Sequence, residues 1–517
     1  MGKLGGFLQI ERIDAPERAP AERVHDYREF MQTLPEGELA QQGARCMECG
    51  VPFCHSGCPV NNLIPDWNDL VYRDKWREAI DQLHRTNNFP DFTGRLCPAP
   101  CEAACVLEIR EGEAVTIKQI ELAIINRAWD EGWVQPKPAA QKTGRTVAVI
   151  GSGPAGMACA QQLARAGHSV TVFERDEGVG GLMRFGVPDA KLEKWIIDRR
   201  ARLLEDEGVT FLCDVDVGRD VSAAELRERF DAVVLAIGSR VHRELEVPGR
   251  ELEGVHFAMD YLYQRNRAVA REEGRPWRAA EREITAAGKH VVVVGGGDTG
   301  MDCISNSLRE GAADVKMLDV YPELPSSGRP ENTPWPLPPK RTLTTYALDE
   351  GGERTWNSEV TALEGDGDGR VARAHSRRVE GTSSRDLRAV PGSEFALPAQ
   401  LVLIAIGFSH PEHDGPVRDL GLDLDARGNV RAPVYATSQP GVFACGDARV
   451  GQSLVVTAIA EGRKCARMVD RHLSGADGNG RPVEPEDPTA HFIEHAAETA
   501  GTVTAGEDFA SGPGAGR

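Results

Sequence analysis

The sequence predicts an α/β protein in which a helical N-terminal domain is followed by two Rossmann-like domains, the second inserted in the first. Three observations predict this organisation. Seven of the twelve cysteines fall within about sixty residues near the N-terminus. Two apolar runs each enter a glycine-rich turn, VAVIGSGPAG at 147–156 and VVVVGGGDTG at 291–300. Two further apolar runs that end in glycine follow them, DAVVLAIGS at 231–239 and QLVLIAIGF at 400–408, so the second half repeats the order of the first.

Length and charge limit the kinds of protein this chain can be. At 517 residues it is too long for one compact core. Its 79 acidic against 60 basic residues give a net charge of −19, which argues against binding to nucleic acid or to an anionic membrane. No stretch approaches the roughly 18 apolar residues of a membrane span, and the N-terminus has no signal-peptide core. We therefore expect a cytoplasmic protein with no nucleic-acid or membrane partner.

The N-terminal segment is predicted to be mostly α-helical. Apolar residues recur at near-helical spacing over 68–84, at Leu70, Val71, Trp76, Ile80 and Leu83. The segment ends in the proline-containing polar passage QPKPAAQKTGR at 135–145, which marks a domain boundary before the first buried strand.

The first glycine loop has the surroundings of a dinucleotide site. Gly151, Gly153 and Gly156 follow a predicted strand and open a predicted helix, whose N-terminus offers N–H groups to a pyrophosphate. The next predicted strand, SVTVFE, ends at Glu174, an acceptor for ribose hydroxyls. A purely structural glycine turn explains this combination less well.

The second glycine loop, with Gly295, Gly297 and Gly300, has the same surroundings, and a nicotinamide dinucleotide is its natural ligand. Aligning the two halves places Asp319 opposite Glu174. A carboxylate there accepts from a free 2′-hydroxyl and repels a 2′-phosphate, which favours NADH over NADPH. The alternative, that Asp319 is a solvated turn residue, remains open, and so does the choice of nucleotide.

The N-terminal cysteines are spaced for metal binding, as Cys46-x2-Cys49-x4-Cys54-x3-Cys58-Pro and Cys97-x3-Cys101-x3-Cys105. Such density in a reducing compartment indicates a metal rather than disulfides. Two zinc knuckles are one interpretation. Tight cysteine runs followed by proline favour iron–sulfur clusters, which, unlike zinc, conduct single electrons beside a flavin. Seven cysteines cannot complete two four-ligand clusters, so an eighth ligand or a smaller cluster is required.

The other cysteines lie in apolar runs and are predicted to be core residues rather than redox groups. They form no CxxC or CxxxxC pair, which a disulfide reductase of the same fold requires. They are Cys159, Cys213, Cys303, Cys445 and Cys465.

Two cysteine-containing passages carry a resemblance to a known family. CMECGVPFCHSGCPVNNLIPDWNDLVY and TNNFPDFTGRLCPAPCEAAC resemble the small (β) subunit of bacterial glutamate synthase, and dihydropyrimidine dehydrogenase has a similar N-terminal domain. The resemblance covers roughly residues 1–472. It implies a helical domain with two [4Fe-4S] clusters and two dinucleotide domains for FAD and NAD(P)H.

The resemblance also implies a ligand set. A carboxylate or amide on the following helix completes the first cluster, and the fourth cysteine of the first run crosses to the second. Carried over, the first cluster takes Cys46, Cys49, Cys54 and Glu121, and the second takes Cys58, Cys97, Cys101 and Cys105. Glu121 lies in the helix-like run VTIKQIELAIINRAW.

The run GVGGLMRFGVP at 178–188 and the later Gly-Asp pair of GVFACGDAR look like FAD signatures of two-dinucleotide flavoprotein reductases. The resemblance implies an FAD site made of Gly151, Gly153, Ala155, Gly156, Glu174, Gly181, Leu182, Lys191, Gly446, Asp447 and Leu454. It implies an NAD(P)H site made of Gly295, Gly297, Asp298, Thr299, Gly300, Asp319, Ile406 and Gly407. Because hydride transfer needs only stacked cofactors, no separate acid or base is expected.

The implied domains are a helical iron–sulfur domain at 1–145, an FAD-binding domain at 146–288 and 411–472, an NAD(P)H-binding domain at 289–410 and a disordered tail at 473–517. We expect an electron-input subunit that oxidises NAD(P)H through FAD and passes electrons through its clusters to the large (α) subunit, where L-glutamate is made from L-glutamine and 2-oxoglutarate. One alternative is an NAD(P)H:ferredoxin or other acceptor oxidoreductase of the same architecture. Another, of a different class, is a zinc-stapled regulatory protein that senses nucleotides.

Overall fold

The computed structural model describes residues 2–280, 282–339, 346–381 and 386–475. The predicted tail therefore lies outside the described residues, apart from its first three positions. Those three belong to helix α18 (Val455–Gly475), and Leu473 is buried, so the ordered chain extends past the predicted boundary. Among the described helices, none combines the length and the apolar character that a bilayer crossing requires.

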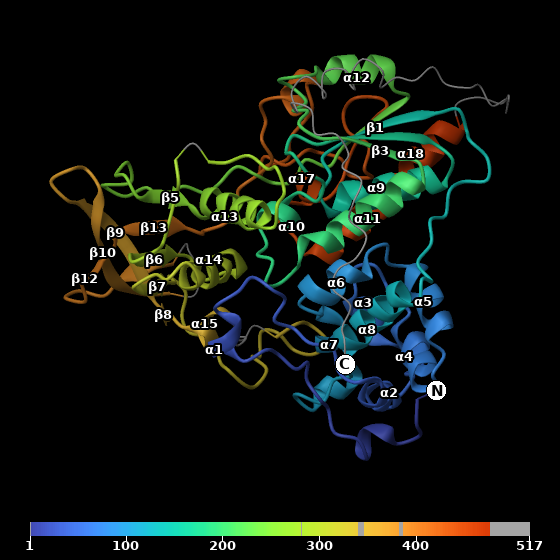
Figure 1. The fold of residues 1–517 in the computed structure, drawn as a ribbon, viewed down its shortest axis with the longest axis horizontal. Coiled ribbons are helices and arrows are strands. Elements are labelled where there is room, and N and C mark those ends of the chain that lie inside the picture. The colour runs from blue at the N-terminus through green and yellow to red at the C-terminus, as the bar shows by residue number, and fades with distance from the viewer. Residues whose placement is uncertain (1, 281, 340–345, 382–385, 476–517) are drawn as a thin grey trace.

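The N-terminal part is built of short helices around a buried core (Figure 1, blue). The predicted helical stretch 68–84 is divided into α4 and α5, because Asp74 adopts a left-handed φ of +57° and accepts a hydrogen bond from Trp76 Nε1 at 2.8 Å. The helices are α1 (Pro20–Arg23), α2 (Glu36–Ala44), α3 (Phe53–Gly57), α4 (Ile64–Tyr72), α5 (Trp76–His84), α6 (Pro90–Leu96), α7 (Pro100–Ala103) and α8 (Ile117–Asp130), with 3-10 turns η1 (Gly6–Leu8) and η2 (Val106–Ile109).

The first α/β domain is a parallel five-stranded sheet in the order β14-β4-β1-β2-β3. The edge strand β14 comes from far along the chain, so the domain is discontinuous. Helices α9 and α18 pack closely on one another beside the sheet (Figure 1). The elements are β1 (Thr146–Ile150), α9 (Pro154–Arg165), β2 (Ser169–Phe173), α10 (Leu182–Phe185), α11 (Lys194–Asp206), β3 (Val209–Leu212), α12 (Ala223–Arg229), β4 (Ala232–Leu235), α16 (Pro416–Asp419), β14 (Val442–Ala444), α17 (Asp447–Val450) and α18.

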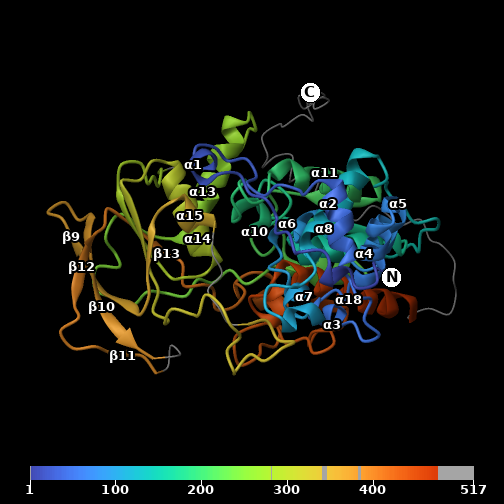
Figure 2. The ribbon, with the colours of Figure 1, turned by 90° about the horizontal axis from the view of Figure 1, so that it is seen from below.

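The second α/β domain is inserted between β4 and β14 and has a parallel sheet in the order β5-β13-β6-β7-β8. A small antiparallel sheet forms its far end (Figure 2). The elements are β5 (Val255–Phe257), α13 (Ala258–Glu272), β6 (His290–Val294), α14 (Asp298–Arg309), β7 (Asp314–Leu318), α15 (Tyr346–Glu350), β8 (Glu353–Thr355), β13 (Leu401–Ile404) and the antiparallel strands β9 (Ser358–Gly365), β10 (Val371–Glu380), β11 (Arg388–Ala389) and β12 (Phe395–Pro398).

The α/β fold class and the inserted second Rossmann-like domain are confirmed. The expected boundary at residue 289 is too late, because β5 pairs with β13 in the second sheet. A three-residue strand without a glycine turn leaves no signal in the sequence. The N-terminal helices share one continuous hydrophobic core with the first sheet, where Ile120, Val147 and Leu163 belong to the same cluster.

Candidate functional site

The first glycine loop joins strand β1 to helix α9. Gly151 has a φ of +100°, and a Cβ there would lie 2.5 Å from Ala236 O. A Cβ on Gly156 would collide with Gly151 O, so this glycine allows the helix to pack on the turn. Gly153 has no heavy atom of the described residues within 4 Å of its Cβ position. Its open side leaves the N-terminus of α9 accessible to a phosphate.

Glu174 follows strand β2 and is buried beside this loop. Its Oε2 accepts hydrogen bonds from Ser152 N at 3.0 Å and Ser152 Oγ at 2.5 Å, and its Oε1 accepts one from Asp176 N at 3.0 Å. Burial raises the pKa of Glu174. The carboxylate thus holds the glycine loop in place while it lines the cavity beside it.

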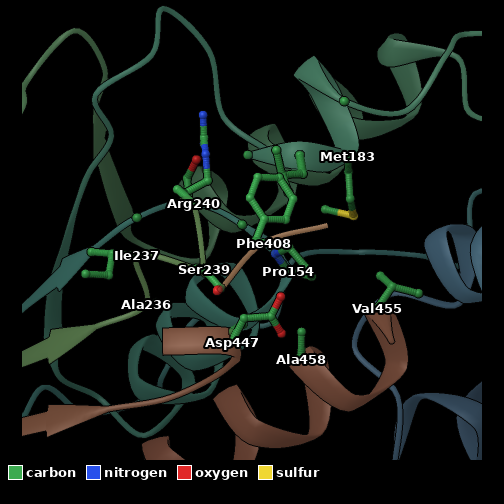
Figure 3. Close-up of a pocket in the computed structure, with 18 of the residues that line it drawn as sticks. Pro154, Met183, Ala236, Ile237, Ser239, Arg240, Phe408, Asp447, Val455 and Ala458 are labelled. Carbon is green, nitrogen blue, oxygen red and sulfur yellow. The ribbon is translucent and has the colours of Figure 1, made fainter. Parts of the chain in front are cut away.

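That cavity, of about 380 Å³, lies where the two α/β domains meet, and we call it the interdomain cavity (Figure 3). Asp298 and Thr299 reach it from the second domain. Of the residues predicted for FAD, Gly156 and Gly446 pack beneath the wall, where a Cβ on Gly446 would lie 2.7 Å from Ala155 Cβ. The others line it: Gly151, Gly153, Ala155, Glu174, Gly181, Leu182, Lys191, Asp447 and Leu454.

Sequence analysis missed several residues of the cavity wall. Arg240, Phe408 and Met183 line the cavity and lie around it in Figure 3. Arg240 and Phe408 lie at the ends of the two strand–glycine runs, so their positions in the sequence were a usable signal. Met183 lies in α10, inside the run at 178–188 that carries the FAD resemblance and next to the predicted Leu182.

Asp447 begins helix α17 at the end of strand β14, and its side chain faces the cavity (Figure 3). It accepts a hydrogen bond from Ser453 Oγ at 2.6 Å. Burial raises the pKa of Asp447 to about 6. The chain therefore places a carboxylate with a raised pKa on the side of the cavity formed by the C-terminal elements.

The second glycine loop repeats the geometry of the first. Gly295 has a φ of +113°, and a Cβ there would lie 2.5 Å from Ala405 O. A Cβ on Gly300 would lie 2.5 Å from Gly295 O, whereas that of Gly297 meets none of the described atoms within 4 Å. The loop therefore offers the N-terminus of α14 to a second phosphate group.

Ile406 and Gly407 follow β13 beside this loop. Ile406 N lies 3.2 Å from the Cβ position of Gly295. Gly407 adopts a φ of +87° next to the side chain of Gln452, which accepts a hydrogen bond from Phe408 N at 3.1 Å. Because Gln452 follows α17, this turn joins the second domain to the first.

Asp319 lies directly after β7 and is 5% exposed, so the interpretation of it as a solvated turn residue is wrong. Its Oδ2 accepts from Arg354 Nη2 at 2.6 Å. Sequence analysis missed Arg354 because it lies in β8, a crossover further along the chain. Arg329, the first arginine after Asp319 in the sequence, instead donates to Ala103 O on the helical domain at 3.4 Å.

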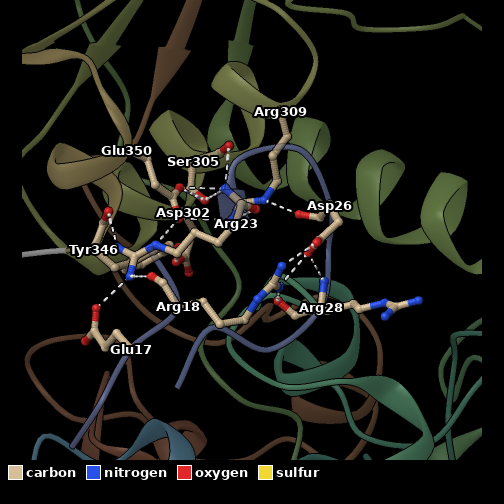
Figure 4. A network of polar contacts seen from close by, with 10 residues as sticks. All are labelled: Glu17, Arg18, Arg23, Asp26, Arg28, Asp302, Ser305, Arg309, Tyr346 and Glu350. Atoms are coloured by element: carbon tan, nitrogen blue, oxygen red, sulfur yellow. Dashed lines mark hydrogen bonds and ion pairs between the residues drawn. The ribbon is translucent and has the colours of Figure 1, made fainter. Parts of the chain in front are cut away.

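A buried polar network fixes the second domain against the rest of the protein (Figure 4). Arg23 of α1 and Arg309 of α14 pair with Glu350 of α15 at 2.9 and 2.5 Å, and all three side chains are at most 1% exposed. Beside them, Lys191 Nζ, which also lines the interdomain cavity, donates to Asp302 Oδ1 at 3.0 Å. Arg23 therefore links the N-terminal segment to the second α/β domain.

The seven N-terminal cysteines and Glu121 line two small cavities in the helical domain. One, the Cys46 cavity, is lined by Cys46, Cys49, Cys54 and Cys105. The other, the Cys97 cavity, is lined by Cys58, Cys97, Cys101 and Glu121. Each set surrounds a space rather than a point, and in the described part of the chain no three His, Cys, Asp or Glu side chains converge as for one metal ion.

This grouping differs from the predicted ligand sets in that Cys105 and Glu121 change places. Ile117, at the start of α8, lines both cavities and separates them. Glu121 lies one helical turn further along α8, on the Cys97 side. Cys105 follows α7, which carries the chain back toward α3 and the Cys46 cavity.

Glu121 is held in an orientation suited to a ligand. Its Oε1 accepts hydrogen bonds from Asn87 Nδ2 at 2.8 Å and Thr93 Oγ1 at 2.6 Å. Both bonds go to one oxygen, Oε1, and the residue lines the Cys97 cavity. A fixed carboxylate among three thiols is a donor set that fits iron.

The Cys97 cavity adjoins the interdomain cavity. Leu96 and Pro98 line the interdomain cavity, while Cys97 between them lines its own. On α18, Val455 lines the interdomain cavity and Val456 lines the Cys97 cavity. A single layer of residues therefore separates the two spaces.

The Cys46 cavity lies nearer to the surface, and a loop of the second domain covers it. Trp335 Nε1 donates to Cys105 O at 3.0 Å, and its ring packs on Phe53 with centroids 4.5 Å apart. The four thiols of this cavity belong to partly exposed residues, whereas the three of the Cys97 cavity are buried.

The remaining cysteines pack into cores, as predicted. Cys159, Cys303, Cys445 and Cys465 are fully buried, and Cys213 is partly buried against the first core.

Two family descriptions match the chain. Residues 145–462 match pyridine nucleotide-disulphide oxidoreductases, and residues 23–133 match the dihydropyrimidine dehydrogenase domain II with its 4Fe-4S cluster. The FAD/NAD(P)H type of fold and an iron–sulfur domain are therefore shown.

Curated relatives match over nearly the whole length. The glutamate synthase [NADPH] small chain of Mycobacterium tuberculosis is 52% identical, covering 94% of this chain and 99% of that protein. The glutamate synthase [NADPH] small chain of Bacillus subtilis is 44% identical, covering 92% of this chain and 99% of that protein. The glutamate synthase [NADH] of Schizosaccharomyces pombe is 45% identical over 92% of this chain but 23% of that protein. Among solved structures, FprA of M. tuberculosis in complex with NADPH shares the fold, with a TM-score of 0.53 and 20% identity over 69% of this chain and 90% of that one.

Proposed function

Because the chain belongs to the family of glutamate synthase small chains, we propose that it is the electron-input subunit of a glutamate synthase. It oxidises NAD(P)H and delivers the electrons to a large (α) subunit, which forms L-glutamate from L-glutamine and 2-oxoglutarate. The partly exposed thiols of the Cys46 cavity suit the reducing cytoplasm, which is the proposed location.

The observation that carries this proposal is the unbroken series of sites through the protein. The second glycine loop meets the interdomain cavity at Asp298 and Thr299, one layer of residues separates that cavity from the Cys97 cavity, and Ile117 separates the latter from the Cys46 cavity. A protein that only sensed nucleotides would have no need of such a series.

The residues of the interdomain cavity fit FAD. The open side of Gly153 and the N-terminus of α9 receive its pyrophosphate, and Glu174 is placed to accept from the adenosine ribose. Lys191 lines the cavity beside Asp302 of the second domain. Asp447 lines it from the C-terminal elements, at the start of α17. When bound, FAD accepts a hydride from NAD(P)H and releases electrons singly. The chain's part in this chemistry is to orient the two rings and exclude water.

The second glycine loop is the proposed NAD(P)H site, with Gly295, Gly297 and Gly300 at the turn. Asp298 and Thr299 begin helix α14 and also line the interdomain cavity, so a nucleotide on this loop is directed toward the FAD site. Ile406 and Gly407 complete the site from the end of β13.

We assign the two [4Fe-4S] clusters to the observed sets of side chains. Cys58, Cys97, Cys101 and Glu121 would hold the cluster next to FAD, and Cys46, Cys49, Cys54 and Cys105 the outer one. The outer set lies nearer to the surface, so electrons would leave the subunit there.

The fission-yeast relative supports the assignment of a large subunit as acceptor. The matched region forms only 23% of that protein, which is named glutamate synthase as a whole. An oxidoreductase that delivers electrons to ferredoxin, with the same architecture, remains the second candidate and differs only in its partner.

Our proposed domains follow the structure: iron–sulfur residues to about 145, an FAD domain at 146–254 and 411–475, and an NAD(P)H domain at 255–410.

Anaerobic purification of the chain tests the cofactor content. We expect a brown protein with bound FAD and about eight iron atoms per chain, as two four-iron clusters require. Titration with NADPH or NADH under anaerobic conditions should bleach the flavin and cluster absorbance together. A yellow protein that contains zinc and no iron would contradict the proposal.

A further inference from the structure

The Asp319–Arg354 ion pair lies against the second glycine loop. Arg354 Nη2 donates both to Asp319 Oδ2 at 2.6 Å and to Gly296 O at 3.0 Å. A Cβ on Gly296 would collide with Asp319 Oδ2. The pair therefore occupies the position beside the loop where a dinucleotide site reads the adenosine ribose.

The carboxylate of this pair is already engaged. Besides the bond from Arg354 to Oδ2, Asp319 Oδ1 accepts from Tyr321 N at 3.1 Å. The side chain is 6% exposed. The Arg354 guanidinium neutralises the charge of this carboxylate toward a 2′-phosphate, so Asp319 does not exclude NADPH.

The guanidinium of Arg354, in contrast, has a hydrogen-bond donor that no described residue uses. Arg354 Nε is buried and has no partner among the described residues. The guanidinium lies over the ring of Trp356, 3.4 Å from its centroid, so it is held in one orientation. A fixed, planar group with unused donors is well suited to a phosphate.

We propose that Arg354 reads the adenosine 2′-phosphate and makes the enzyme prefer NADPH, with Asp319 acting as a positioning residue. This inference rests on the proposed NAD(P)H site. It reverses the preference for NADH that Asp319 alone suggests.

The test uses the full chain with its cofactors and two measurements that need no large subunit. One is the KM for NADPH and for NADH with ferricyanide as acceptor. The other is the Kd of 2′,5′-ADP and of 5′-ADP, which differ only in the 2′-phosphate. Wild-type protein should bind 2′,5′-ADP more tightly.

Arg354→Gln should raise the KM for NADPH and the Kd of 2′,5′-ADP at least about tenfold, while the values for NADH and 5′-ADP change less than about twofold. Arg354→Lys keeps the charge but not the planar guanidinium. Its KM for NADPH and its Kd of 2′,5′-ADP should lie between those of the wild type and those of Arg354→Gln. Arg373→Gln, at an exposed arginine of β10 in the same domain, is the matched control and should change neither. Retained FAD and iron show that each variant is folded.

Asp319→Asn keeps the inference falsifiable if Arg354→Gln fails to fold. We expect the variant to retain the preference for NADPH. A selective rise in the KM for NADH would instead show that Asp319 reads the 2′-hydroxyl and would overturn the inference. An unchanged preference for NADPH over NADH in Arg354→Gln would also overturn the inference. If the wild type binds neither ADP nor NAD(P)H, the proposed nucleotide site itself is wrong, and the inference is overturned with it.

Discussion

Asp91 of helix α6 pairs with Arg200 of helix α11 at 2.5 Å, and both side chains are at most 1% exposed. Arg199 Nη2 and Trp129 Nε1 donate to the other carboxylate oxygen at 2.6 and 2.7 Å. Because α6 belongs to the cluster-binding domain and α11 to the FAD domain, this buried carboxylate joins the two parts between which electrons must pass.

Removing that charge should destabilise the protein. Burial alone would raise the pKa of Asp91, but Arg200, Arg199 and Arg95 outweigh it and hold the pKa well below its ordinary value. Asp91→Asn leaves buried arginines unpaired, and we expect a loss of about 3–5 kcal/mol in the free energy of unfolding, measured by denaturant titration. Asp81→Asn, on an exposed pair, is the control. A loss below about 1 kcal/mol would contradict the assigned role.

The same ion pair predicts a pH dependence. A carboxylate whose pKa is lowered by folding stabilises the protein above its unfolded pKa of about 3.9, and this stabilisation is lost as the pH falls through and below that value. The wild type should therefore lose more stability than Asp91→Asn between about pH 5 and pH 3. Thermal unfolding of both proteins across this range measures the difference, and parallel curves would show that Asp91 does not contribute.

Gly153 and Gly156 of the first loop should respond differently to alanine. Gly153→Ala adds a methyl group to open space where the pyrophosphate is proposed to lie, so FAD binding should weaken about tenfold or more with little change in apoprotein stability. Gly156→Ala should destabilise the apoprotein itself, because its Cβ collides with Gly151 O. FAD titration and apoprotein melting separate the two effects. Full FAD affinity in Gly153→Ala would exclude the proposed approach of the phosphate.

The grouping of the ligands predicts which cluster each substitution removes. Cys105→Ser should remove the same electron paramagnetic resonance signal as Cys49→Ser, and Glu121→Ala the same signal as Cys101→Ser, each with about half of the iron lost. Glu131→Ala, at the exposed end of α8, is the control for Glu121→Ala. If Cys105→Ser and Cys101→Ser removed the same signal, the ligand sets expected from the sequence would be correct instead.

Trp335 is predicted to protect the outer cluster. Trp335→Ala removes the ring that covers Phe53 and the hydrogen bond to Cys105 O, so air should bleach the cluster of the Cys46 cavity faster than in the wild type, with the inner cluster unaffected. The signals of the two clusters, followed during exposure to air, measure this. Equal bleaching rates would mean that the loop does not shield the site.

What the sequence could predict is what local chain geometry determines. Gly151 lies in the turn between β1 and α9, and Glu174 follows β2 beside it, because strand, turn and helix follow one another without interruption and the turn itself sets the spacing of the glycines. The same holds for Gly295 and Asp319 in the second domain.

The remainder depends on contacts between distant segments. Cys105 and Glu121 exchange places because the short helix α7 returns the chain to α3, which the cysteine spacing does not encode. Arg354 reaches Asp319 only because β8 pairs with β7 after a crossover. Strand β5 joins the second sheet without any sequence motif of its own.

The central claim, that this chain feeds electrons to glutamate synthesis, is tested most directly with the large subunit present. The two chains, purified together under anaerobic conditions, should oxidise NAD(P)H only when L-glutamine and 2-oxoglutarate are both supplied, with L-glutamate formed in proportion. A chain that holds FAD and both clusters, fails to bind the large subunit and reduces ferredoxin instead would contradict the account.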